Sequence, residues 1–366
     1  MTLPSEMLEE SPVILCLGSG GVGKTTTAAA LALCAAQRGQ RAVVLTIDPA
    51  RRLADAMGLG DSGQPLGRVR ASALSNDARQ IAGPWPGELW AAMLDPGETF
   101  DGLIRFYAET EEQAERIIGN RLYKNLTETL SGTNEYMAAE RLRELHLDDR
   151  FDIVIVDTPP AKHALDFLDS PSRITRFFDH RLYRSVLAPR KGVRRVVNSA
   201  TQLMMKTIGR FVGTDFLVDV VDFFAAFEGI DQGFRDRAAE VESLLASPKT
   251  SCVIVTAARY EPLQEAEWIS SRLRDRGQEV SLLLVNRLTP RFDLPETEPL
   301  HAGPAAKNHS ELGQLATAEE VVVDELAQQV GAETVLMVYE LLTPVSDLAG
   351  LGELAEQLRD ATYIDP

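Results

Sequence analysis

The chain has 366 residues, of which 45% are hydrophobic and 25% are charged, and its formal net charge at pH 7 is −17. These proportions are those of a soluble protein that buries a large core, and they exclude wholesale disorder. The negative charge would repel a phosphodiester backbone, and no run of lysine or arginine offers a local exception, so we expect no nucleic-acid partner.

Cysteine usage and hydropathy indicate a protein of the cytoplasm. Cys16, Cys34 and Cys252 lie far apart and form no Cys-x-x-Cys pair, so we expect neither a disulfide framework nor a local zinc site. The apolar run Val13–Leu17 is too short for a secretion signal and follows acidic residues. The most apolar later stretch, Phe216–Phe227, is interrupted by two aspartates and falls short of the roughly 20 apolar residues of a membrane span. We expect no stable membrane insertion.

Short apolar runs with β-branched residues recur along the chain and predict the strands of a buried parallel sheet. In chain order they are Val13–Leu17, Ala42–Ile47, Phe151–Val156, Cys252–Thr256, Val280–Val285 and Thr334–Leu342. Helical patterns lie between them, the clearest being Thr25–Arg38 and Leu263–Arg276, each followed by a glycine suited to end a helix. Alternating strands and helices predict an α/β fold with a doubly wound, mostly parallel sheet.

Two long gaps, Gly97–Asp149 and Ser170–Lys249, interrupt this alternation with helical periodicity and few strand signals. We therefore expect a single domain over residues 1–366, with these gaps as helical insertions on one side of the sheet. The stretch Leu294–Leu315 contains three prolines and two glycines, which predict an irregular loop followed by a helix before the last strand.

The segment Gly18–Thr25, Gly-Ser-Gly-Gly-Val-Gly-Lys-Thr, follows a predicted strand and opens a predicted helix. In that context the pattern G-x-x-x-x-G-K-[ST] predicts a phosphate loop, because its glycines let successive N–H groups face phosphate oxygens at the positive end of a helix dipole. We expect Lys24 to bridge the β- and γ-phosphates as a catalytic residue and Thr25 to bind Mg²⁺. A purely structural glycine turn is the alternative. The nucleotide-binding residues predicted here are Gly20, Gly21, Val22, Gly23, Lys24, Thr25 and Thr26.

Two carboxylates follow predicted strands. Asp157 ends the third strand and suits a residue that holds Mg²⁺ through water, although an ordinary strand-ending aspartate is the alternative. Asp48 comes directly after the second strand and is our candidate both for orienting the attacking water and for the metal. Proline and alanine follow Asp48, so a helix N-cap is the alternative there.

With these motifs the chain resembles the arsenical pump-driving and guided-entry tail-anchored protein targeting ATPases, whose deviant phosphate loop is followed by Asp-Pro-Ala and Asp-Thr-x-Pro segments. The matching segments here are Gly18–Thr25, Asp48-Pro-Ala and Asp157–His163. The resemblance implies a dimeric, Mg²⁺-dependent ATPase in which Asp48 activates water and Asp157–His163 form a switch that senses the γ-phosphate. It implies that Asn286, which ends a late strand, contacts adenine, with a structural turn asparagine as the alternative. One phosphate loop is what a bacterial, single-half member would carry.

Three departures from the family pattern change the expectations. Ser19 stands where the family has a lysine that reaches across the dimer, so we expect slow hydrolysis by a homodimer and pairing with a lysine-bearing paralogous ATPase as the alternative. The Cys-x-x-Cys pair of the targeting members is absent, so no zinc is expected. The cysteine cluster of the arsenite pumps is also absent, which argues against arsenite transport.

Gln202–Val212 and Phe216–Phe227 are rich in methionine and phenylalanine. In the targeting relatives the equivalent helices form a groove for a hydrophobic membrane-protein segment, and plain core packing is the alternative here. Two other functions stay open. One is a partitioning or positioning-type ATPase, against which the acidic tail Asp347–Pro366 argues. The other is a weakly hydrolysing, nucleotide-binding partner subunit, which Ser19 favours.

Overall fold

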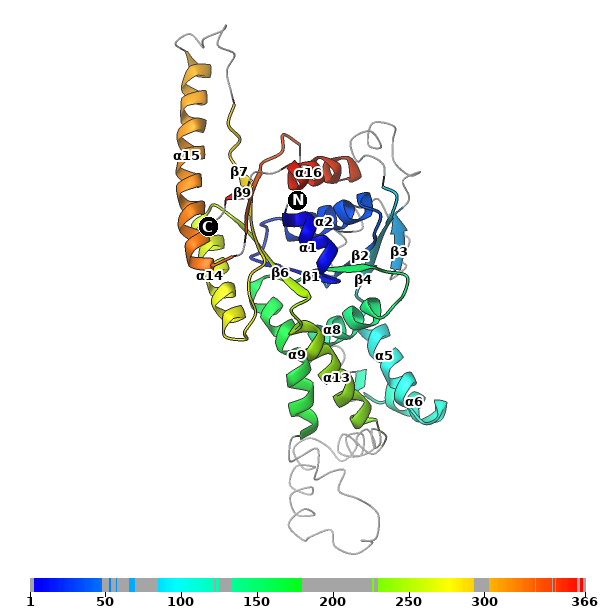
Figure 1. Cartoon of the computed structure of the whole chain (residues 1–366). Coiled ribbons are helices and arrows are strands. Elements are labelled where there is room, and N and C mark those ends of the chain that lie inside the picture. Colours follow the sequence, from blue (N-terminus) through cyan, green and yellow to red (C-terminus); the bar gives the residue numbers. More distant parts are fainter. Residues whose placement is uncertain are drawn as a thin grey trace, which may run out of the picture. The chain divides into compact units, whose positions relative to one another are not determined.

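The computed structural model of the chain (Figure 1) describes residues 3–47, 53, 57, 66–69, 85–121, 123–124, 133–179, 226, 230–292, 303–332, 334–343, 345, 347–360 and 363–364. The chain divides into two compact units. The sheet unit comprises Met1–Leu94, Leu142–Leu165 and Ala246–Pro366, and the helical unit comprises Asp95–Arg141 and Asp166–Leu245. That residues 1–366 act as one domain carrying helical insertions stays a prediction.

In the part of the sheet unit that the structure describes, nine strands form one sheet in the order β3-β4-β2-β5-β1-β6-β7-β8-β9. Its strands are β1 (Val13–Gly18), β2 (Arg41–Thr46), β3 (Leu66–Val69), β4 (Glu88–Met93), β5 (Ile153–Asp157), β6 (Thr250–Ala257), β7 (Leu282–Leu288), β8 (Val335–Tyr339) and β9 (Tyr363–Ile364). The seven inner strands, β4, β2, β5, β1, β6, β7 and β8, pair in parallel. The edge strands β3 and β9 pair antiparallel with their neighbours. The predicted α/β, doubly wound, mostly parallel sheet is confirmed.

Each apolar run that predicts a strand overlaps an observed strand, whereas no apolar run predicts β3, β4 or β9. The sequence of β4, Glu-Leu-Trp-Ala-Ala-Met, contains no β-branched residue, so local preference does not favour a strand there. Its conformation comes from pairing with β2, in which Val44 lies opposite Ala91. Sheet pairing of this kind depends on distant residues and is invisible to a local pattern.

Helix α2 (Lys24–Gln37) is the central helix of the sheet unit, and most of its residues are buried alanine or leucine. It packs on β1, β2 and β5 and against α16 (Leu348–Asp360). Cys34 Sγ donates a hydrogen bond to Ala355 O over 3.5 Å, and Leu351 and Leu358 of α16 are fully or almost fully buried. Gly39, at φ 94°, follows the end of α2 as predicted. The residues just before α2 are therefore held against a well-packed core.

The irregular loop predicted over residues 294–315 is wrong for its later part, because α15 (Pro304–Val330) already begins at Pro304. Proline suits the first position of a helix, since its missing N–H has no partner there and its φ is already helical. Gly313 lies inside the helix, and one glycine costs only about 1 kcal/mol relative to alanine. The proline and glycines that predicted a loop here mark the start and interior of a helix.

Among the described residues, the sheet unit also contains α1 (Leu3–Glu10) and α14 (Tyr260–Arg274), which packs against α15. The helical pattern over residues 263–276 is thus confirmed, with a start three residues earlier, and Gly277 follows at φ 70°. None of the helices in the described ranges is long and apolar enough to cross a membrane.

The helical unit contains α5 (Pro96–Tyr107), α6 (Glu111–Ile118), α13 (Asp231–Leu245) and parts of α8 (Thr133–His146) and α9 (Ala161–Asp179). Its core is aromatic: the Phe234 ring lies 6.0 Å from Phe100, 5.7 Å from Tyr107 and 6.4 Å from Tyr136. Residues 202–212 lie outside the described residues, as do residues 216–227 apart from Ala226. The client groove predicted there stays a prediction.

Candidate functional site

Glycines shape the loop that joins β1 to α2. Gly18, Gly21 and Gly23 have φ values of 151°, 79° and 98°, which residues with side chains rarely adopt. A Cβ on Gly18 would lie only 2.1 Å from the carbonyl oxygen of Val255 on β6. The loop therefore leaves the sheet at a point where only glycine fits.

Gly18→Ala is expected to lower the free energy of unfolding by about 3 kcal/mol, because the added methyl group must push β1 and β6 apart and because φ is unfavourable for alanine. Gly313→Ala is the control, since a Cβ there meets nothing within 4 Å and alanine favours a helix. Chemical denaturation of both variants measures the difference. A Gly18→Ala variant as stable as the unchanged protein would contradict the close approach of the two strands.

Lys24 begins α2 directly after this loop. Gly23 has no side chain to cap the helix, so the N–H groups of the first turn face outward for a ligand. The Lys24 side chain is 7% exposed, and its Nζ donates to Ser19 O at 2.6 Å. Thr26 Oγ1 donates to Gly23 O at 2.8 Å. The lysine thus folds back over the loop, which places its ammonium group beside the loop backbone.

Asp157, the last residue of β5, accepts hydrogen bonds from two hydroxyl groups. Thr25 Oγ1 donates to Asp157 Oδ2 at 2.7 Å, and Thr46 Oγ1 donates to the same oxygen at 3.1 Å. Because β5 lies between β1 and β2, the ends of these strands meet at one edge of the sheet. The structure brings together two predicted metal residues, Thr25 and Asp157. It adds Thr46, the last residue of β2, which the sequence analysis does not propose for the site although it lies in the predicted second strand, Ala42–Ile47.

The loop and its carboxylate fit a triphosphate with Mg²⁺. Ser19 Oγ is buried without a hydrogen-bond partner among the described residues, and an unmet buried hydroxyl costs about 1–3 kcal/mol. A phosphate oxygen would offer such a partner. A Cβ on Gly21 would meet nothing within 4 Å, so the loop is open to a ligand there. Thr25 and Asp157 supply the hard oxygen ligands that Mg²⁺ prefers.

The predicted switch, residues 157–163, begins beside the loop. A Cβ on Gly20 would lie 4.0 Å from Pro160 Cγ. Thr158 Oγ1 donates to Cys16 O at 2.7 Å, which ties the segment to β1, and α9 starts at Ala161. The structure places Pro160 against the phosphate loop. Whether the segment senses the γ-phosphate stays a prediction.

Asp48 lies outside the described residues, so its catalytic and metal roles stay predictions. The described chain before it ends at Ile47, whose N–H donates to Asp157 O at 3.2 Å.

Asn286 lies near the end of β7 and is 7% exposed. Its Nδ2 donates to Val22 O at 2.8 Å, and its Oδ1 accepts from the N–H of Arg287 at 2.9 Å. The structure therefore places this residue against the phosphate loop, next to the predicted nucleotide-binding residue Val22. The contact with adenine that the resemblance implies stays a prediction.

A cavity of ≈ 830 Å³ opens beside Thr26 and Asn286. This volume lies within the range of small-molecule sites. Its apolar walls come from segments far apart in the chain: Phe292, Leu312, Leu315, Tyr339, Leu341, Leu342, Val345 and Leu354. The sequence does not predict this cavity, because Leu312 and Leu315 of α15 lie in the stretch for which it predicts a loop.

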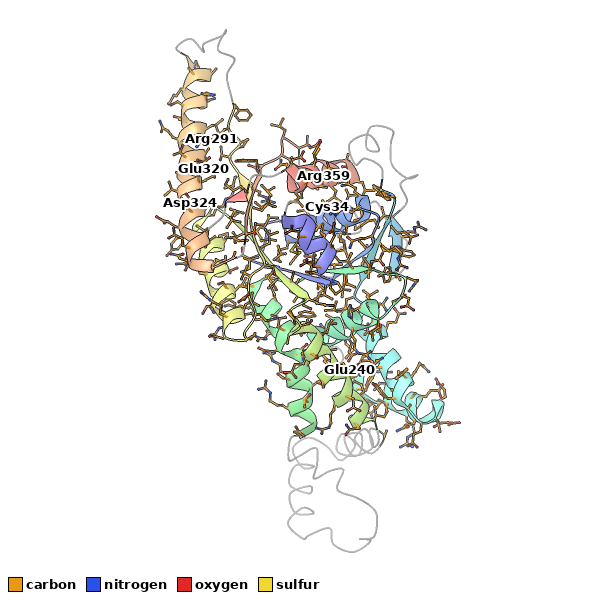
Figure 2. All side chains as sticks on the ribbon, in the orientation of Figure 1. Cys34, Glu240, Arg291, Glu320, Asp324 and Arg359 are labelled. Atoms are coloured by element: carbon orange, nitrogen blue, oxygen red, sulfur yellow. The ribbon has the colours of Figure 1, made fainter. Side chains whose placement is uncertain are left out.

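A bidentate ion pair joins α15 to the segment that follows β7 (Figure 2). Arg291 donates from Nε and Nη2 to the two carboxylate oxygens of Glu320, at 2.8 Å and 2.6 Å. The N–H of Thr289 donates to Glu319 at 2.7 Å. These bonds hold α15 beside the end of β7, and with it the apolar wall that α15 contributes to the cavity.

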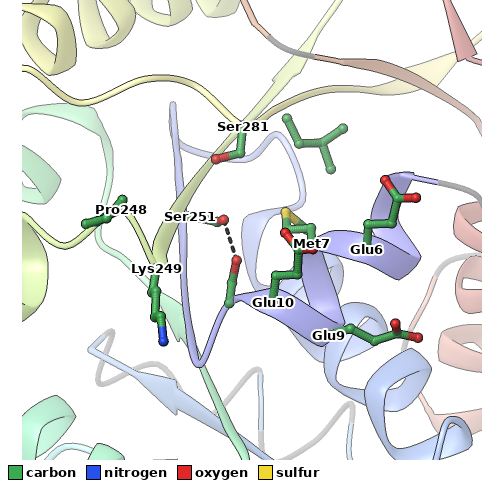
Figure 3. Close-up of a pocket in the computed structure, with 10 residues that line it drawn as sticks. Glu6, Met7, Glu9, Glu10, Pro248, Lys249, Ser251 and Ser281 are labelled. Atoms are coloured by element: carbon green, nitrogen blue, oxygen red, sulfur yellow. Dashed lines mark hydrogen bonds between the residues drawn. The ribbon is translucent and has the colours of Figure 1, made fainter.

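A second cavity, of ≈ 700 Å³, lies at the opposite edge of the sheet, where α1 meets the amino ends of β6 and β7 (Figure 3). Glu6, Glu9 and Glu10 line it together with Lys249. Because three carboxylates and one ammonium group are among its lining residues, this cavity disfavours a triphosphate. This cavity therefore suits a triphosphate less well than the edge that carries the phosphate loop.

The three thiols are buried, on β1, α2 and β6 as predicted. Leu15 pairs with Cys252, so Cys16 and Cys252 point to opposite faces of the sheet. Burial raises the pKa of Cys34 and of Cys252 to about 12, and burial with the nearby Asp157 charge also raises that of Cys16. Neutral buried thiols are chemically inert.

The chain is similar in sequence to known proteins over most of its length. The family model described as anion-transporting ATPase matches residues 11–305. The ATPase GET3 of Malassezia globosa is 26% identical over 277 residues, which cover 75% of this chain and 72% of that protein. An uncharacterized protein of Streptomyces coelicolor is 27% identical over 309 residues, 84% of this chain and 70% of its own length. An arsenical pump-driving ATPase of Acidiphilium multivorum is 24% identical over 301 residues, 81% of this chain and 42% of that protein. Because the family model matches well over half of its residues, the chain belongs to the anion-transporting ATPase family and is an ATPase of that family.

Proposed function

We propose that the chain hydrolyses Mg²⁺-bound ATP to ADP and phosphate and uses the γ-phosphate to change its conformation. The observation that carries this proposal is the meeting of Lys24, Thr25 and Asp157 at one edge of the sheet, with the Thr25 hydroxyl 2.7 Å from the carboxylate. This combination of cation, hydroxyl and carboxylate is what phosphoryl transfer requires of a phosphate-loop protein.

The nucleotide would lie across the loop with its base in the larger cavity. The phosphates would accept from the N–H groups of the loop and the first turn of α2. Thr26 and Asn286 border both the loop and the cavity, so the sugar and base would continue from them toward the apolar walls. Those walls suit the faces of a purine, and the polar residues Thr289 and Glu340 line the same cavity.

The residues of the site would divide the chemistry among them. Lys24 would exchange its bond to Ser19 O for charge-assisted bonds to phosphate oxygens, which are stronger. Thr25, Asp157 and the predicted Asp48 would hold Mg²⁺, which when bound neutralises charge on the β- and γ-phosphates. Thr46 keeps Asp157 in place, and Asp48 is the predicted orienter of the attacking water.

A change at the switch segment has a covalent path into the helical unit. The segment ends in α9, a continuous helix over Ala161–Asp179, and the helical unit includes its residues from Asp166 onward. Movement of Pro160 on loss of the γ-phosphate would therefore be passed along α9. This is an order of events found in nucleotide-driven switches.

We further propose that the chain works as a dimer in the cytoplasm, either with a second copy or with a lysine-bearing paralogous ATPase. Ser19 supports the second arrangement, because it offers no cation and lies 6% exposed in the loop. A hydrophobic or tail-anchored membrane protein is the proposed client, on the strength of the methionine- and phenylalanine-rich residues 202–227. Co-purification from native cells with mass spectrometry of the bound proteins tests the partner and the client.

Ser19→Lys is expected to raise ATP turnover of the isolated chain at least tenfold, because a cation at the transferring phosphoryl group lowers the barrier. Ser19→Met is the matched control, of similar length without the charge. Phosphate release is measured at several protein concentrations, since a cation supplied across a dimer makes turnover depend on concentration. Fast turnover of the unchanged chain, unaffected by the lysine, would contradict the proposal. Tight ATP binding with negligible turnover in all three proteins would favour a binding subunit.

A further inference from the structure

The carboxamide of Asn286 packs closely against the backbone of the phosphate loop. Its Nδ2 donates to Val22 O at 2.8 Å, and a Cβ on Gly23 would lie 2.4 Å from the same nitrogen. The space that any side chain at position 23 would need is therefore taken by Asn286. This contact links β7 to the loop across 264 residues of sequence.

The backbone after Asn286 holds the carboxamide in this orientation. Arg287, at φ 59°, is the one residue other than glycine with a positive φ in the described part of the chain. Its N–H donates to Asn286 Oδ1 at 2.9 Å, and the pairing of β7 with β8 shifts register between Val285 and Leu288. A residue with left-handed backbone conformation, at a point where strand pairing is irregular, often redirects a side chain at a functional site.

The bond to Val22 O also orients the next peptide group. A trans peptide is planar, so its C=O and N–H point in opposite directions. Drawing the Val22 carbonyl toward Asn286 therefore turns the Gly23 N–H away from β7. A phosphate loop works by aiming such N–H groups at its ligand.

We propose that Asn286 is a positioning residue that holds the phosphate loop in its binding shape, and that it acts on the phosphates of the ligand and not on the choice of base. The inference rests on the proposed function, because it concerns the same nucleotide site. The adenine contact implied by the family resemblance predicts that loss of Asn286 weakens binding of ATP alone. A positioning role predicts that it also weakens binding of ligands without adenine.

The test is calorimetric titration of the Mg²⁺ complexes of ATP, GTP and inorganic tripolyphosphate into the unchanged protein and Asn286→Ala. Positioning predicts that the variant binds all three about tenfold more weakly, since one hydrogen bond that shapes the loop is lost, and that the ratio of ATP to GTP affinity is unchanged. A loss confined to ATP, with tripolyphosphate binding unchanged, would overturn the inference and leave the proposed function standing. Failure of the unchanged protein to bind any of the three would overturn the proposed function itself.

Ser270→Ala is the matched control. It removes another buried bond from a side chain to the backbone, Ser270 Oγ to Val330 O at 2.8 Å, between α14 and α15. It is expected to lose stability without loss of tripolyphosphate binding. Asn286→Asp keeps the acceptor for the Arg287 N–H but turns a carboxylate toward Val22 O, so it is expected to bind more weakly than Asn286→Ala.

A double-mutant cycle tests the contact without any ligand. Gly23→Ala should destabilise the unchanged protein more than it destabilises Asn286→Ala, because the 2.4 Å overlap exists only when the carboxamide is present. Chemical denaturation measures the four proteins. If Gly23→Ala lowers the free energy of unfolding equally in both backgrounds, the close contact between the Asn286 carboxamide and Gly23 is contradicted.

Discussion

Lys24→Met is expected to lower the rate of ATP hydrolysis about a thousandfold while the protein keeps its fold. The Lys24 ammonium group lies beside the loop backbone, bonded to Ser19 O and 7% exposed, so its charge acts where water is largely excluded. Methionine keeps most of the apolar stem and removes only the charge and its donors. Phosphate release measures the rate, and the melting temperature checks the fold.

Two further variants sharpen the Lys24 result. Lys24→Arg is expected to be nearly as slow, because a planar guanidinium does not replace a compact ammonium in a closed loop. Lys249→Met, which alters the acidic cavity at the opposite edge of the sheet, is expected to leave hydrolysis unchanged. Hydrolysis by Lys24→Met within threefold of the unchanged protein would show that the reaction takes place elsewhere.

Asp157→Asn is expected to lower Mg²⁺-dependent hydrolysis by a factor of about 100 to 1000 and to raise the Mg²⁺ concentration needed for half-maximal rate. Asparagine keeps the size of the side chain and an oxygen that can accept from Thr25 and Thr46, so the hydroxyl contacts can persist. What it removes is the negative charge that the metal requires. Binding of ATP without Mg²⁺ should not weaken, because a negative charge near the phosphates is gone.

The matched control for Asp157 is Asp152→Asn. Asp152 lies just before the same strand but pairs with Arg41 at the surface, and that guanidinium lowers the pKa of the Asp152 carboxyl. Asp152→Asn should leave the rate of hydrolysis and the Mg²⁺ dependence of that rate unchanged, since an exposed ion pair contributes little to stability. An Asp157→Asn protein with an unaltered Mg²⁺ profile would remove this carboxylate from the metal site.

The parts of the fold that were predicted are those set by local chemistry. The runs that became β1, β2, β5, β6 and β7 are buried and mostly β-branched or leucine, and the phosphate loop carries its geometry in its own glycines. Strand β4 was missed because its conformation comes from pairing with β2. The start of α15 was missed because Pro304 can equally begin a helix or interrupt a loop.

The candidate site was predictable to a similar extent. Lys24, Thr25 and Asp157 follow from a motif and a strand end, and the structure brings Thr25 and Asp157 together. Thr46 could have been found from the rule that neighbouring parallel strands end at the same edge. The walls of the larger cavity could not, because they come from four separate segments of the chain, around Phe292, in α15, over residues 339–345 and in α16. The bond from Asn286 to the loop depends on the left-handed Arg287, which no sequence pattern shows.

A crystal structure with Mg²⁺ and a non-hydrolysable ATP analogue tests the central claim most directly. We predict that the phosphates accept from the N–H groups of Gly20 to Thr25 and from Lys24 Nζ, that the metal contacts the Thr25 hydroxyl, and that the base lies in the cavity bounded by Phe292 and Leu315. A nucleotide bound at another place, with this loop free of phosphate, would contradict the account.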